Sequence, residues 1–209
     1  MESISLLIFV SIAIPMLLMC AVLKGRSRTL VLFLLFGVVA AIVSGTVNNY
    51  IIRQTDYTRF YVTINIAPAV EEIVKAVPVL IFAFALKKDR QSLLESAIAC
   101  GLGFAMYENI YLLLQTENLT FSLAMLRGLG AGLVHSICTL AVAFGVSLLV
   151  KRKTWFLSGT VALLATAMTF HSLYNILIQS EYMVFGLVLP VCAYIPIAVL
   201  SIKYYKNKC

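Results

Sequence analysis

The chain has 209 residues, of which 62% are hydrophobic and 12% are charged. Water-soluble domains have about half apolar and about a quarter charged residues, so this composition excludes a soluble fold and predicts a membrane protein. The formal net charge of +7 comes from short basic clusters between apolar runs. Such clusters are typical of membrane-protein loops and exclude a nucleic-acid-binding patch.

Seven apolar stretches are long enough to cross a bilayer, since a spanning helix needs about 20 mostly apolar residues. They lie near residues 4–23, 30–52, 60–86, 93–115, 121–150, 155–179 and 182–203. The sequence therefore predicts an all-α fold, a single domain over residues 1–209 built as a bundle of about seven transmembrane helices. The third and fifth stretches are long, which favours a tilted or a broken helix in each.

Four basic clusters, on alternate connections between these stretches, predict the orientation of the bundle. They are Lys24/Arg26/Arg28, Lys87/Lys88/Arg90, Lys151/Arg152/Lys153 and Lys203/Lys206/Lys208. Lysine and arginine are concentrated in cytoplasmic loops of membrane proteins. We therefore expect the N-terminus outside and the C-terminus in the cytoplasm.

Ionisable residues also occur inside the apolar stretches, where each costs at least ~2.5–3.5 kcal/mol on insertion scales and usually marks a site or a pathway. These residues are Glu71, Glu72, Lys75, Glu108 and Arg127, together with the two histidines of the chain, His135 and His171. Their presence predicts a polar functional site within the bundle.

Counting along the helices indicates that four of these side chains can meet. Glu72, Glu108, His135 and His171 each lie 15 to 18 positions from the basic flank of their own stretch. At about 1.5 Å per residue, that spacing is roughly 22–27 Å for all four. Four residues on four helices therefore share one level, somewhat toward the outer side.

Neighbouring residues fit a packed polar site. Glu71 and Lys75 are four positions apart and can pair along one helix face, and Pro68 and Pro78 bracket a segment where a broken backbone is expected. Gly128 and Gly132 form a small-xxx-small pair that predicts a close helix approach before His135.

Buried carboxylates beside imidazoles can catalyse hydrolysis in two ways. Histidines and a carboxylate can hold a divalent metal such as zinc, which makes water more acidic while a second carboxylate acts as general base. Alternatively, a carboxylate activates water without a metal, while imidazole and amide groups stabilise the oxyanion. The sequence leaves both routes open.

The ordered motifs on successive stretches resemble the PrsW family of bacterial intramembrane proteases, over about residues 68–178. The motifs are Glu71-Glu72-Ile-Val-Lys75, Gly103-Phe104-Ala-Met-Tyr-Glu108-Asn109, Arg127 with His135, and Phe170-His171-Ser-Leu-Tyr174-Asn175. The family pattern is Glu-Glu-x-x-Lys, Phe-x-x-x-Glu and His-x-x-x-Asp. The family is related to the type II CAAX prenyl endopeptidases and, distantly, to the scaffold subunit of gamma-secretase.

The resemblance implies roles for specific residues. The implied catalytic set is Glu71, Glu72, Glu108, His135 and His171, with Lys75, Asn109, Arg127 and Asn175 in support. Glu108, His135 and His171 are the implied ligands if a metal such as zinc is bound. Asn175 stands where the family usually has Asp, which would leave His171 without a charged partner.

The resemblance also implies a place and a substrate. We expect a multi-pass protein of a bacterial plasma membrane that cleaves a single-pass membrane protein, such as an anti-sigma factor, near the outer side. One alternative is a non-catalytic membrane scaffold that uses the same polar cluster. A less favoured alternative is an ion-coupled carrier, because such carriers more often have inverted repeats and a continuous polar path.

Overall fold

The computed structural model describes residues 2–85, 89–117, 120–149 and 156–206, and every regular element in these ranges is a helix. The helices are α1 (Glu2–Val22), α2 (Gly25–Gln54), α3 (Arg59–Asn65), α4 (Ala67–Ala85), α5 (Arg90–Leu113), α6 (Phe121–Leu149), α7 (Phe156–Ile178) and α8 (Met183–Lys206). The basic residues Lys87, Lys88, Lys151–Lys153 and Lys208 lie outside the described ranges.

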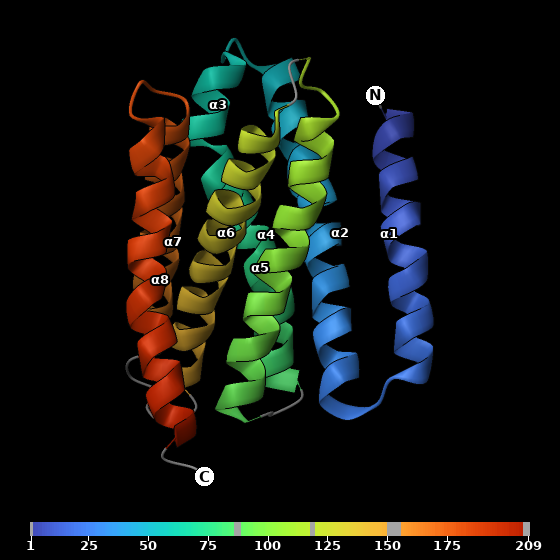
Figure 1. Ribbon diagram of the computed structural model, residues 1–209, viewed down its shortest axis with the longest axis vertical. Coiled ribbons are helices and arrows are strands. Elements are labelled where there is room, and N and C mark those ends of the chain that lie inside the picture. The colour runs from blue at the N-terminus through green and yellow to red at the C-terminus, as the bar shows by residue number, and fades with distance from the viewer. Residues whose placement is uncertain (1, 86–88, 118–119, 150–155, 207–209) are drawn as a thin grey trace.

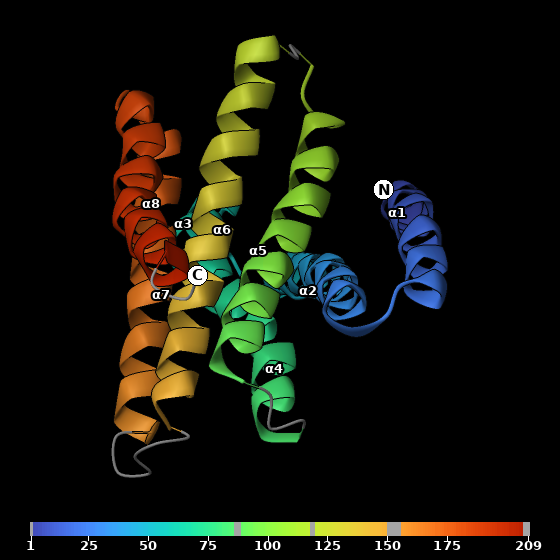
Figure 2. The ribbon, with the colours of Figure 1, turned by 60° about the horizontal axis from the view of Figure 1, so that its bottom comes forward.

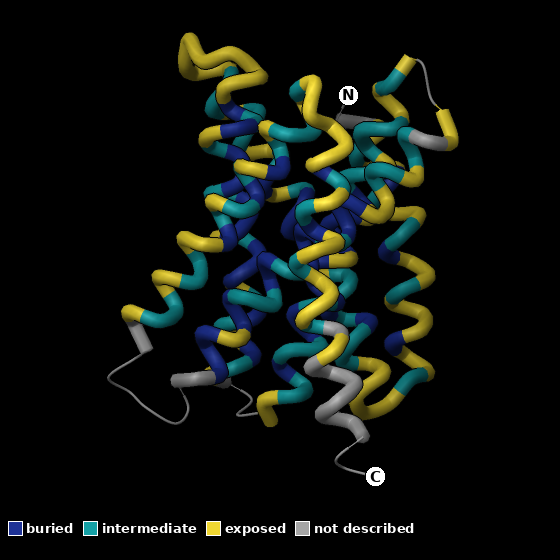
Figure 3. The backbone as a smooth tube through the Cα atoms, turned by 60° about the vertical axis from the view of Figure 1, so that its left-hand side comes forward, coloured by how far each residue is buried: buried dark blue, intermediate teal, exposed yellow. Residues whose placement is uncertain are grey.

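The long helices run side by side along the long axis of the molecule, with α1 at one edge and α8 at the other (Figure 1). The helices α2, α5, α6 and α7 pack in series, and α4 contacts all four of them, so α4 is the central element. Figure 2 shows α1 at the edge of the bundle beside α2, and α1 contacts only α2 and α5 among the described elements. Buried residues concentrate in the middle of the bundle (Figure 3).

Within the part of the chain that the structure describes, five helices are long and apolar enough to cross a membrane, namely Ile4–Val22, Gly25–Gln54, Arg90–Leu113, Leu123–Ser147 and Ser158–Ile178, and the apolar segment Met183–Ile197 is shorter. Their outward side chains are apolar and exposed; Leu6 is 61% and Leu18 is 65% exposed. These surfaces suit contact with lipid. The predicted all-α membrane fold is confirmed, while the number of seven spans and the orientation stay predictions.

The third predicted stretch, near residues 60–86, forms a broken helix, which is one of the two forms expected for it. The helix α3 ends at Asn65 and α4 begins at Ala67, with Ile66 between them. Pro68 explains the break, because it has no N–H to donate to a carbonyl of the preceding turn. The fifth stretch, in contrast, is the unbroken helix α6. We call the end of the bundle at which α2 finishes and α3 begins the α3 end.

Three glycines, Gly37, Gly101 and Gly103, let the helices approach closely at the level of the core. A Cβ atom added to Gly37 or Gly103 would lie 2.0 Å from a backbone oxygen of the facing helix, which joins α2 tightly to α5. A Cβ on Gly101 would lie 2.5 Å from the His135 carbonyl oxygen, which joins α5 to α6.

The prediction that Gly128 and Gly132 make the close approach is wrong. A Cβ atom added at either position would meet no neighbouring atom within 4 Å, because no helix packs its backbone against α6 at these two positions. The close contact of α6 with α5 lies further along α6, where Gly101 faces His135.

The opposite end of the bundle is closed by polar contacts at helix starts. Arg26 near the start of α2 pairs with Glu95 in α5, and Asp89 caps α5 by accepting a hydrogen bond from the Ser92 backbone N–H. The start of α1 lies at the α3 end and the last turn of α8 at the opposite end (Figure 1). Placing these two points at opposite ends agrees with an odd number of passes.

Candidate functional site

Four helices bring the predicted polar residues together in the middle of the bundle. The contributors are α4 with Glu71, Glu72 and Lys75, α5 with Glu108, α6 with His135, and α7 with His171. Side-chain contacts link all six residues in one chain of interactions. The structure therefore places all five predicted catalytic residues in one group, while their individual roles stay predictions.

One half of this group is sealed from solvent. Lys75 Nζ lies 2.7 Å from Glu72 Oε1, and the side chains of both residues are fully buried. The ion pair of Lys75 is with Glu72, three positions before it, rather than with Glu71, the partner that the sequence allowed. Along the helix Lys75 points between these two glutamates, about 40° from Glu71 and about 60° from Glu72, so helix rotation alone does not decide the partner.

Glu72 also holds His171, whose Nδ1 lies 2.8 Å from Glu72 Oε1. An ionised carboxylate only accepts hydrogen bonds, so Nδ1 donates this bond, and in a neutral imidazole Nε2 then presents a lone pair. The prediction that His171 lacks a charged partner is therefore wrong, because Glu72 supplies it. Asn175 instead donates its side-chain N–H to the Thr63 carbonyl oxygen at 3.0 Å, which ties α7 to α3.

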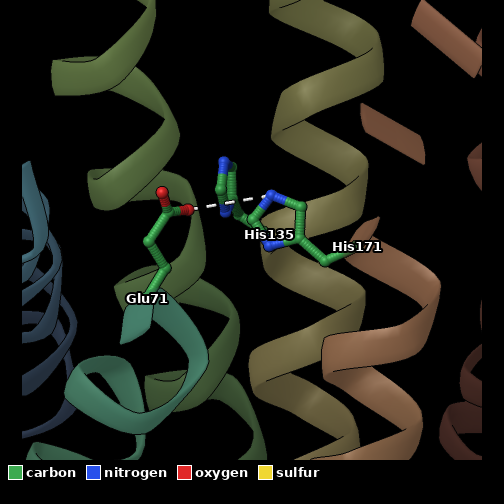
Figure 4. A group of neighbouring side chains, drawn as sticks. All are labelled: Glu71, His135 and His171. Carbon is green, nitrogen blue, oxygen red and sulfur yellow. Dashed lines mark ion pairs between the residues drawn. The ribbon is translucent and has the colours of Figure 1, made fainter. Parts of the chain in front are cut away.

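Glu71 faces the free nitrogen of His171. Glu71 Oε2 lies 3.7 Å from His171 Nε2 (Figure 4), and this oxygen is buried with no hydrogen-bond partner. Glu72 Oε2 also lacks a hydrogen bond, but Lys75 balances the charge of that carboxylate. Two acceptor atoms that face each other without a proton between them are favourable only if a cation or a proton donor lies between them.

His135 is held from both sides of its ring. Lys75 Nζ lies 3.0 Å from His135 Nδ1, and because an ammonium only donates, Nδ1 accepts this bond. The other nitrogen, Nε2, lies 2.8 Å from Glu108 Oε2 and donates to it. The His135 ring packs on Phe104, with 4.6 Å between ring centroids, and edge-on against His171, with 4.8 Å between centroids.

Glu71, His135 and His171 form a group that could hold a metal ion, with one ligand atom from each lying within 4.8 Å of the others. Figure 4 shows the three side chains converging. A carboxylate with two imidazoles is a common donor set for zinc. The unpartnered Glu71 Oε2 and the lone pair on His171 Nε2 fit a divalent cation, and Glu72 on His171 Nδ1 is the usual outer partner of a ligating histidine.

This group differs in one residue from the predicted ligand set of Glu108, His135 and His171. Glu71 takes the place of Glu108, which contacts His135 Nε2 and stands beside the group. The sequence gives no rotational phase for α4 or α5 that would have decided between these two glutamates.

A cavity of about 590 Å³ connects the group to the α3 end. Its wall includes the carboxylates of Glu71 and Glu108 and both histidines, whereas Glu72 and Lys75 are not among the described wall residues. The supporting residues Arg127 and Asn175 line the same cavity. The site is thus a hollow that one set of polar groups faces and another set seals from behind.

Two predicted supporting residues join helices through backbone contacts. Asn109 donates its side-chain N–H to the Arg127 carbonyl oxygen at 3.1 Å, which fixes α5 against α6.

Arg53 and Arg59 also line the cavity, and they were not among the predicted site residues. The signal that could have found them is a pair of arginines in a connection predicted to lie outside, against the usual distribution of basic residues.

Comparisons with known sequences address the family directly. A family model described as PrsW family intramembrane metalloprotease matches residues 25–201. A search of curated proteins and a search of solved structures each found no match. The matched range contains every residue of the polar group, and only α1 and the end of α8 fall outside it. The chain is a multi-pass membrane protein and belongs to the PrsW family of intramembrane metalloproteases.

Proposed function

We propose that this protein hydrolyses a peptide bond of a membrane-embedded substrate with a divalent metal ion held by Glu71 and His171, and by His135 once its Nε2 has lost to solvent the proton that it donates to Glu108. The observation that carries the proposal is the facing pair of Glu71 Oε2 and His171 Nε2, 3.7 Å apart and without a hydrogen bond between them. A divalent ion such as zinc, when bound there, supplies Lewis-acid chemistry that polarises a carbonyl and makes water more acidic.

Glu108 is the general base of this proposal. Its side chain is 27% exposed, compared with 11% for Glu71 and 0% for Glu72, and it lies on the cavity wall. A base must reach the water from which it takes a proton. Glu108 therefore accepts a proton from the attacking water and returns it to the leaving amine, and the peptide bond is replaced by a carboxyl and an amino group.

Glu72 and Lys75 are positioning residues in this proposal. Both are sealed from the cavity, so neither has access to water or substrate. Glu72 fixes the His171 ring so that Nε2 faces Glu71, and Lys75 contacts both Glu72 and His135. This arrangement favours Glu71 over Glu72 as the member of the Glu-Glu motif that acts in the site.

The substrate we propose is a single-pass membrane protein of the anti-sigma-factor kind in a bacterial plasma membrane. The family resemblance suggests this class, and the cavity supports the position of the cut. Its wall reaches residues at the ends of α2, α5 and α7, away from the basic clusters at the starts of α2 and α5. With the basic clusters in the cytoplasm, cleavage occurs near the outer boundary of the bilayer.

The test is cleavage of a fluorogenic transmembrane peptide by purified protein in lipid nanodiscs, with metal content measured in parallel. We expect cleavage that a chelator abolishes and added zinc restores. We also expect Glu71→Gln to lose both metal and cleavage, while the matched change Glu117→Gln in the exposed α5–α6 connection loses neither.

Two outcomes would contradict the proposal in different ways. Cleavage that resists the chelator but is lost in Glu71→Gln would favour the metal-free carboxylate route. A folded wild-type protein that binds no metal and cleaves no transmembrane peptide would favour the non-catalytic scaffold.

A further inference from the structure

The cavity has a cationic wall between the Glu71 group and the α3 end. Arg53 from the last turn of α2, Arg59 at the start of α3, and Arg127 from α6 all line it. Among the described wall residues, Glu71 and Glu108 are the only acidic ones, and both belong to the site. Substrate chain leaving the site toward the α3 end therefore passes three positive charges.

Arg127 has a buried donor without an acceptor. Its Nε atom is buried and has no hydrogen-bond partner among the described residues. Its carbonyl oxygen accepts from Asn109, which fixes the backbone and leaves the guanidinium to face the cavity. A buried donor without an acceptor is unfavourable, so a ligand that supplies an acceptor there gains from it.

Glu108 is the nearest internal candidate to pair with Arg127, since both line the cavity, but its Oε2 contacts His135 instead. Among the described residues, no carboxylate forms an ion pair with Arg53, Arg59 or Arg127. Glu108 attracts Arg127 electrostatically without such a contact, so an external anion has room to bind the guanidinium groups.

We propose that Arg127, assisted by Arg53 and Arg59, binds a carboxylate of the substrate on the side of the cut that faces the α3 end. The inference rests on the proposed function for the position of the cut. A guanidinium offers a planar fork of N–H donors that matches a carboxylate, and it stays charged at any physiological pH. Arg127 is therefore a specificity-determining residue.

The helix geometry gives the distance between the cut and this carboxylate. Arg127 precedes His135 by eight positions on α6, which is about 12 Å along the helix axis. An extended peptide advances about 3.3–3.6 Å per residue. The preferred acidic residue therefore lies roughly three or four positions from the scissile bond, toward the α3 end.

The experiment compares transmembrane peptides that differ only in one residue, Glu or Gln, at each of six positions on that side of the cut. A further peptide ends at the preferred position with a free carboxylate, which separates a side-chain carboxylate from a chain terminus. For wild type we expect kcat/KM to be about tenfold higher for Glu than for Gln at the third or fourth position, as a charge-assisted contact predicts. In Arg127→Gln this ratio falls to about one, whereas in the control Arg28→Gln, at the opposite end of the bundle, it stays at the wild-type value.

A binding arm keeps this inference separate from the proposed function. Affinities of the same peptides for the Glu71→Gln protein are measured by fluorescence polarisation, which needs no cleavage. Tighter binding of the Glu peptide that disappears with Arg127→Gln supports the inference even if the proposed chemistry fails. Equal binding of the Glu and Gln peptides overturns it, even if both peptides are cleaved in the metal-dependent way.

Discussion

Two neighbouring parts of the site hold glutamate carboxylates in different environments. Glu72 lies in a sealed network with Lys75, whereas Glu71 and Glu108 face the cavity. Glu72 has an ammonium 2.7 Å away and no exposure. Among the described residues Glu71 has no cation in contact, and its Oε2 faces the imidazole of His171 at 3.7 Å. Although Glu71 and Glu72 are adjacent in the sequence, the first faces a hollow and the second faces a lysine.

This difference in environment predicts different roles for the two adjacent glutamates, a structural role for Glu72 and a chemical role for Glu71. A buried carboxylate that is paired and sealed can orient its neighbours but cannot exchange protons with water. A carboxylate on a cavity wall without a paired cation can accept a proton or bind an ion. We therefore expect substitutions in the sealed network to change stability first, and substitutions on the cavity wall to change catalysis first.

The largest effect is expected from Glu108→Gln, which removes the proposed base. Loss of a general base lowers kcat by about 10²–10⁴-fold. The melting temperature and the bound metal should change little, because Glu108 lies outside the three-residue ligand group and on the cavity wall. Steady-state cleavage of a transmembrane peptide, with calorimetry and metal analysis, checks all three quantities. A variant with wild-type kcat would assign the base to another residue.

The sealed network is tested by Lys75→Met, which leaves the Glu72 carboxylate buried without its cation. Breaking a buried pair by removing one partner costs about 3–5 kcal/mol of unfolding free energy, whereas removing both partners is close to neutral. The double variant Glu72→Gln/Lys75→Met should therefore recover most of the loss, as measured by denaturant unfolding in detergent micelles. Lys24→Met, at an exposed position, is the control. Equal stability of Lys75→Met and the control would show that the pair is dispensable.

The helices of this fold were predictable because a bilayer forces backbone hydrogen bonds to close within each segment, so local hydropathy is enough. The meeting of Glu72, Glu108, His135 and His171 was predictable for a related reason. Depth in a bundle follows from counting residues at a fixed rise per residue from a basic flank. Neither inference needs the packing of one helix on another.

Rotation and close packing were not predictable in the same way. A helix turns about 100° per residue, so an uncertainty of one residue at the start of α4 exchanges the faces of Glu71 and Glu72. The break at Ile66 sets this phase, and only the position of Pro68 pointed to it. Small residues permit a close approach without requiring one, which is why Gly101 and Gly103 make contacts that Gly128 does not make.

A smaller effect is expected from removing the hydrogen bond between Glu72 and His171, which links the sealed network to the cavity-facing group. The double variant Glu72→Gln/Lys75→Met removes the carboxylate on His171 Nδ1 without leaving a lone buried charge. Loss of such an outer partner lowers metal affinity about 10–100-fold. Competition with a chelator of known zinc affinity measures this change. Asn175→Asp serves as the comparison and should leave the affinity unchanged, because Asn175 contacts Thr63. The same loss in Asn175→Asp would assign the orienting role to position 175.

The smallest expected effect comes from a carboxylate in water, Asp89, which lies outside the spanning segments at the start of α5. Hydrogen bonds from the Ser92 hydroxyl and backbone N–H hold the pKa of Asp89 below its ordinary value. Because the pKa is lower in the folded state, the stabilisation is present at neutral pH and is lost as the pH falls through the folded-state pKa. Asp89→Ala should cost about 0.5–2 kcal/mol at neutral pH, and this difference from wild type should shrink on acidification. Unfolding of both proteins across that pH range measures it. A difference that grows on acidification would mean that Asp89 does not cap α5 as a carboxylate, and the contrast among sealed, cavity-facing and solvent-exposed acids would lose its third member.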